Sequence, residues 1–281
     1  MRINTNVSSL TAQEAASNTN KTLSSSLEKL STGLKINKAS DDASGLAIAD
    51  KLRTQATSIN QGVANGNSAV SLLQIADKSM AEQSNILDTI KAKLIQANTD
   101  TTSSDGRESI RKDIDKLLDQ LDNIAAQTNY NGTTLLQASS SSKAASSGLT
   151  FQVGETSSDT ISNTAIRSNT SGLSLSTLAG LSANGLTQSV AAAQQTVIDT
   201  AITTLNGYRG DVGSTQNQVE SAVRNLMTQA TNVTAAESII RDVDYAQESA
   251  NFNKQNIISQ AGSYAISQAN SVQQNVLRLL Q

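Results

Sequence analysis

The amino-acid sequence predicts a mainly α fold, a long antiparallel helical bundle or coiled coil with a small β-hairpin region in the middle of the chain. Three observations predict it. Apolar residues return every seven positions across residues 45–97, which is the heptad spacing of a coiled-coil seam. The 281 residues include no Pro, the residue that interrupts long helices. Aromatic residues make up only 2% of the chain, fewer than a compact globular core of this length normally uses.

Residues 45–136 are expected to hold two helices, each followed by a turn. A helix over residues 45–97 reaches roughly 80 Å at about 1.5 Å per residue, which is longer than a lone globular domain needs. The turn-forming stretch TTSSDG at 101–106 separates it from a second helix, whose apolar residues alternate three and four positions over 110–128. The Asn-Gly pair within 129–132 then ends that helix as a strong turn signal.

The middle of the chain changes character, because Ser, Thr, Gly and Asn prevail over residues 133–187. Within it, Leu149, Phe151 and Val153 alternate with other residues, which predicts a short strand. We therefore expect one or two β-hairpins, and a disordered linker is the alternative. Helical spacing returns near Gln188.

A last helix is expected after the stretch RDVDYAQES, from about residue 249 to the end of the chain. Both ends of the chain carry an apolar stripe that a short isolated helix cannot bury by itself. The stripes predict either mutual packing of the two ends or assembly with copies of the same chain. Their members are Ile3, Val7, Leu10, Leu23, Leu27 and Leu30 near the N-terminus and Ile258, Ala261, Ala265, Ala269, Val272, Val276 and Leu279 near the C-terminus.

Composition excludes several functional classes. The chain has no Cys and no His, so it lacks a disulfide, a thiolate nucleophile and the commonest general base and metal ligand. Its net charge is −3 and no basic cluster occurs, so we expect no nucleic-acid partner. No apolar run is long enough for a cleavable signal peptide or a transmembrane helix, so the chain is expected to be cytoplasmic or exported with its N-terminus intact. The paired carboxylates Asp41–Asp42 and Asp242/Asp244 fit helix caps and solvated faces better than catalysis.

A polar loop interrupts two good helices within the stretch LSTGLKINKASDDASGLAIADKLR at 30–53. Gly33 is expected to loosen the end of the first helix, and Ser40, Asp41 or Asp42 to cap the second. The alternative is an ordinary loop with no further role. The loop residues of interest are Gly33, Asn37, Ser40, Asp41, Asp42 and Gly45.

Several long motifs together resemble bacterial flagellin: RINTNVSSLTAQ, LSTGLKINKASDDASGLAIADKLRTQ, NYNGTTLL, FQVG and NVTAAESIIRDVDYAQES. The resemblance covers residues 1–136 and 188–281 in the family's order. The stretches TIKAKLIQA and FQVG are most similar in sequence to flagellins of the Campylobacter-related group.

The resemblance implies a subunit of the flagellar filament, with its N- and C-terminal helices paired. Residues 1–44 and 243–281 are expected to form terminal inner-tube helices with a spoke made by the polar loop. Residues 45–136 and 188–242 are expected to form an outer-shell helical rod, and residues 137–187 a short variable segment on the surface. A hook–filament junction protein is the alternative within the same class. Flagellins that carry a zinc protease need an H-E-x-x-H motif, which a chain without His excludes.

The resemblance also implies partners and a route. The chain is expected to leave the cell unfolded through the flagellar export channel and to fold at the tip of an extracellular filament made of copies of itself. An export chaperone is expected at the C-terminus, and filament cap and hook-junction proteins as neighbours. We expect no enzyme activity, cofactor, metal site or membrane insertion.

The middle of the chain is a candidate for O-glycosylation, because such sugars are usual in the Campylobacter-related group that it resembles. A plain solubilising loop is the alternative. The candidate acceptors are Ser139, Ser140, Ser141, Ser142, Ser146, Ser147, Ser157, Ser158, Thr160, Ser162, Thr164, Ser168, Thr170, Ser171, Ser174, Ser176 and Thr177.

Many flagellins are bound by a Toll-like receptor through an Arg, a Leu and a Glu on the outer-shell helices. Alignment by apolar positions puts Thr89 at the Arg, Lys93 at the Leu and Asp113 at the Glu. Thr89 has no guanidinium, and Lys93 brings a charge to an apolar contact. The resemblance therefore predicts weak or absent receptor recognition, and packing between protofilaments is the alternative role of these residues.

Overall fold

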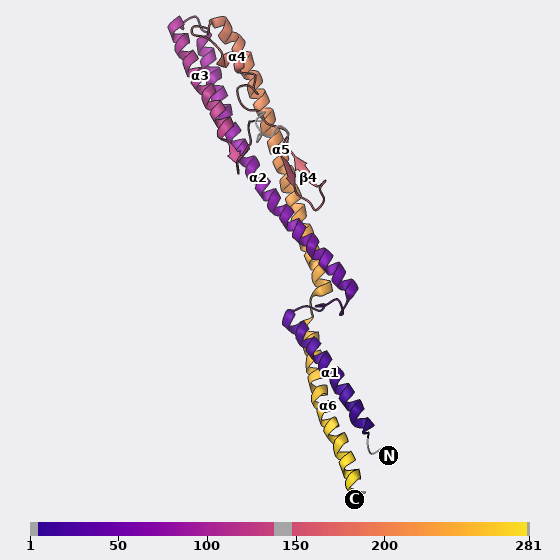
Figure 1. The fold of residues 1–281 in the computed structure, drawn as a ribbon. Coiled ribbons are helices and arrows are strands. Elements are labelled where there is room, and N and C mark those ends of the chain that lie inside the picture. The colour runs from indigo at the N-terminus through magenta and orange to yellow at the C-terminus, as the bar shows by residue number, and fades with distance from the viewer. Residues whose placement is uncertain (1–4, 138–147, 280–281) are drawn as a thin grey trace. The chain divides into compact units, whose positions relative to one another are not determined.

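The computed structural model describes residues 5–137 and 148–279 of the chain (Figure 1). The chain divides into two compact units. Unit 1 takes in the described parts of residues 1–56 and 231–281, and unit 2 takes in those of residues 57–230. Helices α2 (Ala43–Ala97) and α5 (Gln188–Arg241) contribute residues to both units.

Unit 1 is built on two helices from opposite ends of the chain, α1 (Val7–Thr32) and α6 (Tyr245–Leu279), which lie side by side (Figure 1). The Asn6 side chain caps α1 by accepting a hydrogen bond from the Ser9 N–H at 3.2 Å. Helix α1 ends at Gly33, which adopts a left-handed conformation with φ 75°.

Unit 2 contains most of α2 and α5, together with α3 (Ser104–Gln127) and the short α4 (Ser176–Ala179). The turn between α2 and α3 is closed by Arg107, whose guanidinium donates hydrogen bonds to the Ala97 carbonyl at 2.9 Å and the Thr99 carbonyl at 3.0 Å. The Ser103 hydroxyl oxygen accepts a hydrogen bond from the Gly106 N–H and caps α3.

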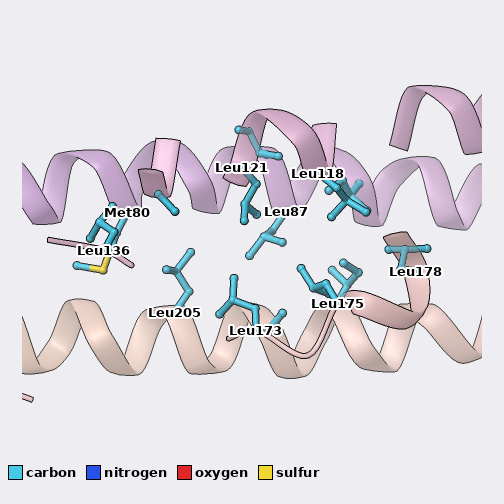
Figure 2. Close-up of a cluster of buried hydrophobic side chains, with 14 of the residues drawn as sticks. Met80, Leu87, Leu118, Leu121, Leu136, Leu173, Leu175, Leu178 and Leu205 are labelled. Atoms are coloured by element: carbon cyan, nitrogen blue, oxygen red, sulfur yellow. The ribbon is translucent and has the colours of Figure 1, made fainter. Parts of the chain in front are cut away.

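The hydrophobic core of unit 2 is continuous along these helices. Figure 2 shows how Met80 and Leu87 from α2, Leu121 from α3 and Leu205 from α5 converge on one another. Leu173, Leu175 and Leu178, from the segment that contains α4, fill the space beside them (Figure 2). Burying such a side chain contributes roughly 1.5–3 kcal/mol before conformational entropy is counted.

Two small antiparallel hairpins lie in the middle of the chain. Strands β1 (Asn129–Tyr130) and β2 (Thr133–Thr134) flank a two-residue turn, and strands β3 (Thr150–Gln152) and β4 (Thr160–Ser162) form the second pair. The turn residues Asn131 and Gly132 have φ 50° and φ 80°, as a type I′ turn requires.

The predicted fold class is confirmed by these long helices and two hairpins. The heptad seam corresponds to α2, and α5 begins at Gln188, where helical spacing returns in the sequence. The expectation that residues 137–187 lie on the surface is wrong for part of the segment, because Leu173, Leu175 and Leu178 are buried in the core. None of the described helices combines the length and the apolar character needed to cross a membrane.

Candidate functional site

Helices α1 and α6 pair through rows in which small and polar side chains alternate with a few large apolar ones. Ser9 and Ser26 are the buried residues of α1, and the half-buried positions between them follow a three-four spacing. Those positions are Ala12, Ala16, Thr19 and Leu23, and Leu30 continues the row. The corresponding half-buried row on α6 includes Phe252, Ser259, Gly262, Ile266 and Ala269.

Specific contacts fix the register of this helix pair. The Asn6 side-chain amide donates a hydrogen bond to the Ala269 carbonyl at 3.1 Å, and the Ser259 hydroxyl donates to the Asn20 side-chain oxygen at 2.9 Å. A Cβ placed on Gly262 meets the Ala16 Cβ at 3.8 Å, an ordinary van der Waals distance. The two helices therefore approach closely at Gly262.

Several other large apolar side chains of the two terminal helices are exposed to solvent. Val7 is 62% exposed, Leu10 55% and Val272 52%. We call the following residues the exposed apolar set: Val7, Leu10, Leu27, Ile257, Ile258, Tyr264 and Val272. On α6, Ile257 and Tyr264 are seven residues apart and share a face away from the half-buried row, whereas Ile258 lies at the edge of that row.

The structure divides the residues predicted as terminal stripes. Leu23, Leu30 and Ala269 are half-buried and belong to the rows where α1 and α6 meet. Five large members and both remaining alanines are exposed: Val7, Leu10, Leu27, Ile258, Ala261, Ala265 and Val272. Ile3 lies outside the described residues, and the side chains of Val276 and Leu279 are not described although both positions lie in α6. Mutual packing alone thus leaves most of the apolar stripe unburied.

The polar loop after α1 is held against the connection between α5 and α6. Leu34 forms an antiparallel bridge with Asp242. The Lys35 N–H donates to the Arg241 carbonyl at 2.6 Å, and the Val243 N–H donates to the Gly33 carbonyl at 3.0 Å. These backbone hydrogen bonds tie together two segments from opposite ends of the sequence.

Two adjacent aspartates organise the loop in different ways. Asp42 caps α2, because its carboxylate accepts a hydrogen bond from the Gly45 N–H at 2.9 Å. Asp41 accepts hydrogen bonds from the backbone N–H groups of Lys38 at 3.0 Å and Asn37 at 3.1 Å. These bonds stabilise its charged form and hold the pKa of Asp41 below its usual value. Of the three capping candidates, Asp42 is the cap, and Ser40 lies exposed in the loop.

Sequence reasoning missed the apolar anchor of this loop. Ile36 is only 3% exposed, and it is one apolar residue within a polar stretch. A Cβ on Gly45 lies 2.8 Å from the Ile36 Cδ1, so only Gly fits there without displacing the anchor. Periodicity could not identify Ile36 as a buried residue, because the loop has no helical repeat. Its burial becomes evident only from its packing in the structure.

The two other paired carboxylates also serve local structure. Asp244 accepts hydrogen bonds from the N–H groups of Ala246 and Gln247 at the start of α6. The Asp242 carboxylate accepts a hydrogen bond from the Ser238 hydroxyl at 2.5 Å. Within the described ranges, no group of three or more His, Cys, Asp or Glu side chains is placed to hold a metal ion.

The three receptor-equivalent positions lie in unit 2. Lys93 and Asp113 form an ion pair, with 2.8 Å between the Lys93 Nζ and the Asp113 Oδ2. Thr89 is exposed, and its hydroxyl donates to the Asn85 carbonyl at 2.9 Å. Two of the three positions are thus brought together, each neutralising the charge of the other.

The candidate sugar acceptors do not share one environment. The expectation that Ser168 is accessible is wrong, because it is fully buried and its hydroxyl donates to the Leu136 carbonyl at 3.4 Å. Thr170 is half-buried, and its hydroxyl donates to Asp122 at 2.7 Å. The exposed candidates are Ser157, Ser158, Thr160, Ser162, Thr164, Ser171, Ser174, Ser176 and Thr177. The candidates Ser139, Ser140, Ser141, Ser142, Ser146 and Ser147 lie outside the described residues.

Comparison with known proteins identifies relatives along the whole chain. Flagellin of Bacillus subtilis (strain 168) is 35% identical over 303 aligned positions that cover all of both chains. The flagellar filament 33 kDa core protein of Treponema phagedenis is 32% identical, again over all of both chains. Flagellin B of Helicobacter pylori (strain ATCC 700392 / 26695) is 46% identical over 66% of this chain and 37% of that protein.

Solved structures agree with this kinship. The crystal structure of Bacillus cereus flagellin matches 62% of this chain and 94% of that chain, with 30% identity and a TM-score of 0.50. A putative flagellar hook-associated protein from Vibrio parahaemolyticus matches 72% of this chain and 99% of that chain, with a TM-score of 0.58. Its 13% identity shows the shared fold alone. The flagellin and filament-protein relatives favour a filament subunit over a junction protein.

Two family models cover most of the sequence. The bacterial flagellin N-terminal helical region matches residues 3–141, and the bacterial flagellin C-terminal helical region matches residues 195–280. The chain therefore belongs to the bacterial flagellin family, the structural subunits of the flagellar filament.

Proposed function

We propose that this flagellin polymerises with copies of itself through the exposed apolar set of unit 1. The observation that carries the proposal is that the pairing of α1 and α6 leaves Val7, Leu10 and Val272 more than half exposed. Removing apolar surface from water contributes roughly 25 cal/mol per Å², so burial of this set between subunits stabilises the polymer. The terminal helices serve as inner-tube helices, and the loop at 33–45 serves as the spoke between the terminal helices and the outer-shell rod.

The same surface accounts for the proposed route to the filament. An exposed apolar face on a free subunit favours association before export. An export chaperone that covers the C-terminal helix prevents this in the cytoplasm, and the chain passes unfolded through the flagellar channel. Cap and hook-junction proteins contact the same terminal helices at the two ends of the filament. Binding of purified chaperone to the full chain, and its loss in a variant truncated before α6, tests this route.

Seeded polymerisation tests the proposed surface. Purified subunit is mixed with short filament seeds, and the sedimented fraction is measured over time. In Val272→Asp the carboxylate has to be buried without a partner, so we expect the subunit to remain soluble. Ser267→Asp is the matched control, because Ser267 is exposed on α6 outside the exposed apolar set. Sedimentation of Val272→Asp at the control's rate contradicts the proposal.

Weak recognition by the Toll-like receptor is a second proposal, carried by the ion pair between Lys93 and Asp113. A receptor that uses a carboxylate at Asp113 must compete with Lys93 for it, and Thr89 supplies no guanidinium. Reporter cells exposed to purified monomer measure the response. Strong activation at nanomolar concentration contradicts the proposal, and a Thr89→Arg and Lys93→Leu double variant is expected to raise the response.

O-glycosylation of the exposed Ser and Thr residues within 157–177 is also proposed. Their hydroxyls are accessible in unit 2, apart from those of Ser168 and Thr170. Intact mass spectrometry of the native protein checks it, because each sugar adds mass to the 29.3 kDa chain. A mass equal to that of the unmodified chain contradicts glycosylation.

A further inference from the structure

Four Asn-Gly pairs occur in the chain, and the structure gives them different environments. In such a pair the backbone nitrogen of Gly can attack the side-chain carbonyl carbon of Asn. The pairs begin at Asn65, Asn131, Asn184 and Asn206. We propose that Asn131 is the site at which this flagellin undergoes spontaneous deamidation, and that the other three pairs are protected by the fold.

The reaction balances with water as the only co-reactant. A bond forms between the Gly132 nitrogen and the Asn131 side-chain carbon, and the carbon–nitrogen bond of the side-chain amide breaks. Ammonia leaves and carries away the proton of the Gly132 nitrogen, and the product is a five-membered succinimide. Water then opens the ring to give either Asp or isoaspartate, in which the main chain runs through the former side-chain carbon.

Asn131 lies at the tip of the β1–β2 turn, where its surroundings allow this attack. The residue is exposed and holds a φ of 50°, a conformation that non-Gly residues rarely adopt. In the described part of the chain, the Gly132 N–H donates to no acceptor, and nothing lies within 4 Å of a Cβ placed on Gly132. The two strands pair only at Asn129 with Thr134 and at Tyr130 with Thr133, and the next residues along join through one hydrogen bond from the Leu135 N–H to the Thr128 carbonyl. The nitrogen is thus free, and the turn can rearrange at small cost.

The other three pairs lack a free nucleophile. Asn65 and Asn206 lie in the interiors of α2 and α5, where the N–H of the following Gly is engaged in the helical ladder. Asn184 resembles Asn131 in its exposure and its φ of 60°. However, the Gly185 N–H donates to the Ser182 carbonyl at 2.8 Å, and the Asn184 N–H donates to Glu108 at 2.8 Å. The two turns otherwise look alike, and what distinguishes them is whether the Gly N–H is hydrogen-bonded, as at Gly185, or free, as at Gly132.

The consequence for the protein lies directly after the turn. Leu135 and Leu136 follow β2 and are buried in the core of unit 2. The Leu135 N–H donates to the Thr128 carbonyl at 3.1 Å, which fixes the start of this segment. Isoaspartate adds a carbon to the main chain of a two-residue turn, and so it disturbs the register that places these leucines.

The test follows all four sites in one sample. Folded full-length monomer is incubated in mildly alkaline buffer made with oxygen-18 water, and peptides are quantified by mass spectrometry. We expect label at Asn131 to appear at least about tenfold faster than at Asn65 or Asn206, because those sites react only after local helix opening. The same incubation in denaturant is the control, and there the four rates are expected to converge. Equal rates in the folded protein, or faster labelling at Asn184, overturn the proposal.

A second measurement tests the consequence. Asn131→Asp reproduces the charge of the product but keeps the length of the main chain. We expect the aged isoaspartate fraction to unfold at lower urea concentration than Asn131→Asp does. Equal midpoints show that the leucines stay in place and overturn the claimed effect on the core.

Discussion

Units 1 and 2 are both made of long helices, yet they bury different kinds of side chain. In unit 2, leucines and isoleucines from α2, α3 and α5 form one continuous core (Figure 2). In the described part of unit 1, the buried apolar residues are Ile36, Ala49 and Ala56. The helix pair meets through many Ser, Thr, Ala and Gly residues, and its large apolar residues at the contact are only half-buried. Long helices can therefore either bury their large apolar residues within a unit or leave many of them exposed, and the difference lies in where those residues point.

The largest expected contrast comes from shortening one leucine in each unit. Leu87→Ala removes a fully buried side chain, and we expect it to lower the free energy of unfolding by about 2–5 kcal/mol. Leu10→Ala changes an exposed side chain, and we expect less than about 0.5 kcal/mol in the monomer. Urea unfolding of unpolymerised protein, followed by circular dichroism, measures both. Comparable losses for the two variants contradict the distinction between the units.

The sequence predicted those parts of this contrast that follow from a periodic pattern or a turn motif. Heptad spacing located α2, and the Asn-Gly signal located the β1–β2 turn. The terminal stripes were recognisable as apolar, but their spacing alone could not say whether α1 and α6 bury them against each other. The structure shows that smaller residues such as Ala16 and Gly262 occupy that contact, because close backbone approach needs little side-chain volume.

Contacts without a repeat were not predictable. Leu173, Leu175 and Leu178 lie among Ser, Thr and Gly, so the local sequence indicates a polar loop, and only the core they fill explains them. Gln83 is a second example, because it is a polar residue among the buried apolar positions of α2. It is fully buried and donates hydrogen bonds to the carbonyls of Leu121 and Ser168, both at 3.1 Å. Long-range pairings of this kind depend on tertiary structure rather than on propensity.

A pair of glycines tests the difference in packing more finely. A Cβ on Gly62 in unit 2 lies 2.2 Å from the Val153 carbonyl oxygen, so Gly62→Ala forces the β3–β4 hairpin off α2. We expect a loss of about 1–3 kcal/mol. Gly262→Ala in unit 1 meets Ala16 at a normal distance, and we expect a gain of up to about 1 kcal/mol from better helix propensity. Urea unfolding measures both, and destabilisation by Gly262→Ala contradicts the conclusion that a Cβ fits at Gly262 beside Ala16.

A smaller effect is expected from the cap of α2 in unit 1. Asp42→Ala removes the acceptor of the Gly45 N–H, and we expect the first turn of α2 to lose about 0.5–2 kcal/mol. Amide hydrogen exchange at Gly45 and Leu46 reports the opening of that turn. Ser40→Ala is the matched control in the same exposed loop, because it leaves both aspartates in place. Unchanged exchange in Asp42→Ala shows that another group supplies the cap.

The smallest expected effects are pH shifts, one in each unit. In unit 2, hydrogen bonds from the Arg111 guanidinium and from the Asn184 N–H lower the pKa of Glu108 from 4.5 to about 2. In unit 1, the pKa of Asp41 is lowered by backbone hydrogen bonds from Lys38 and Asn37. A carboxyl whose pKa is lower in the folded state stabilises that state above its unfolded pKa, and the contribution disappears as the pH falls through the folded pKa.

The contribution of Glu108 is therefore complete above pH 4.5 and is lost between pH 4.5 and about 2. We expect carboxyl carbon shifts in NMR to place its titration near the lower value, and Glu108→Gln to remove that part of the pH dependence of unfolding. Because unit 2 has its own core, Glu108 should titrate with the folded-state value in free monomer. Asp41 depends on a loop tied to the α5–α6 connection, so its pKa should approach the ordinary value wherever unit 1 opens. If the monomer shows an ordinary pKa for Glu108 and a lowered pKa for Asp41, then unit 1 and not unit 2 keeps its structure in the free monomer, and the prediction is wrong.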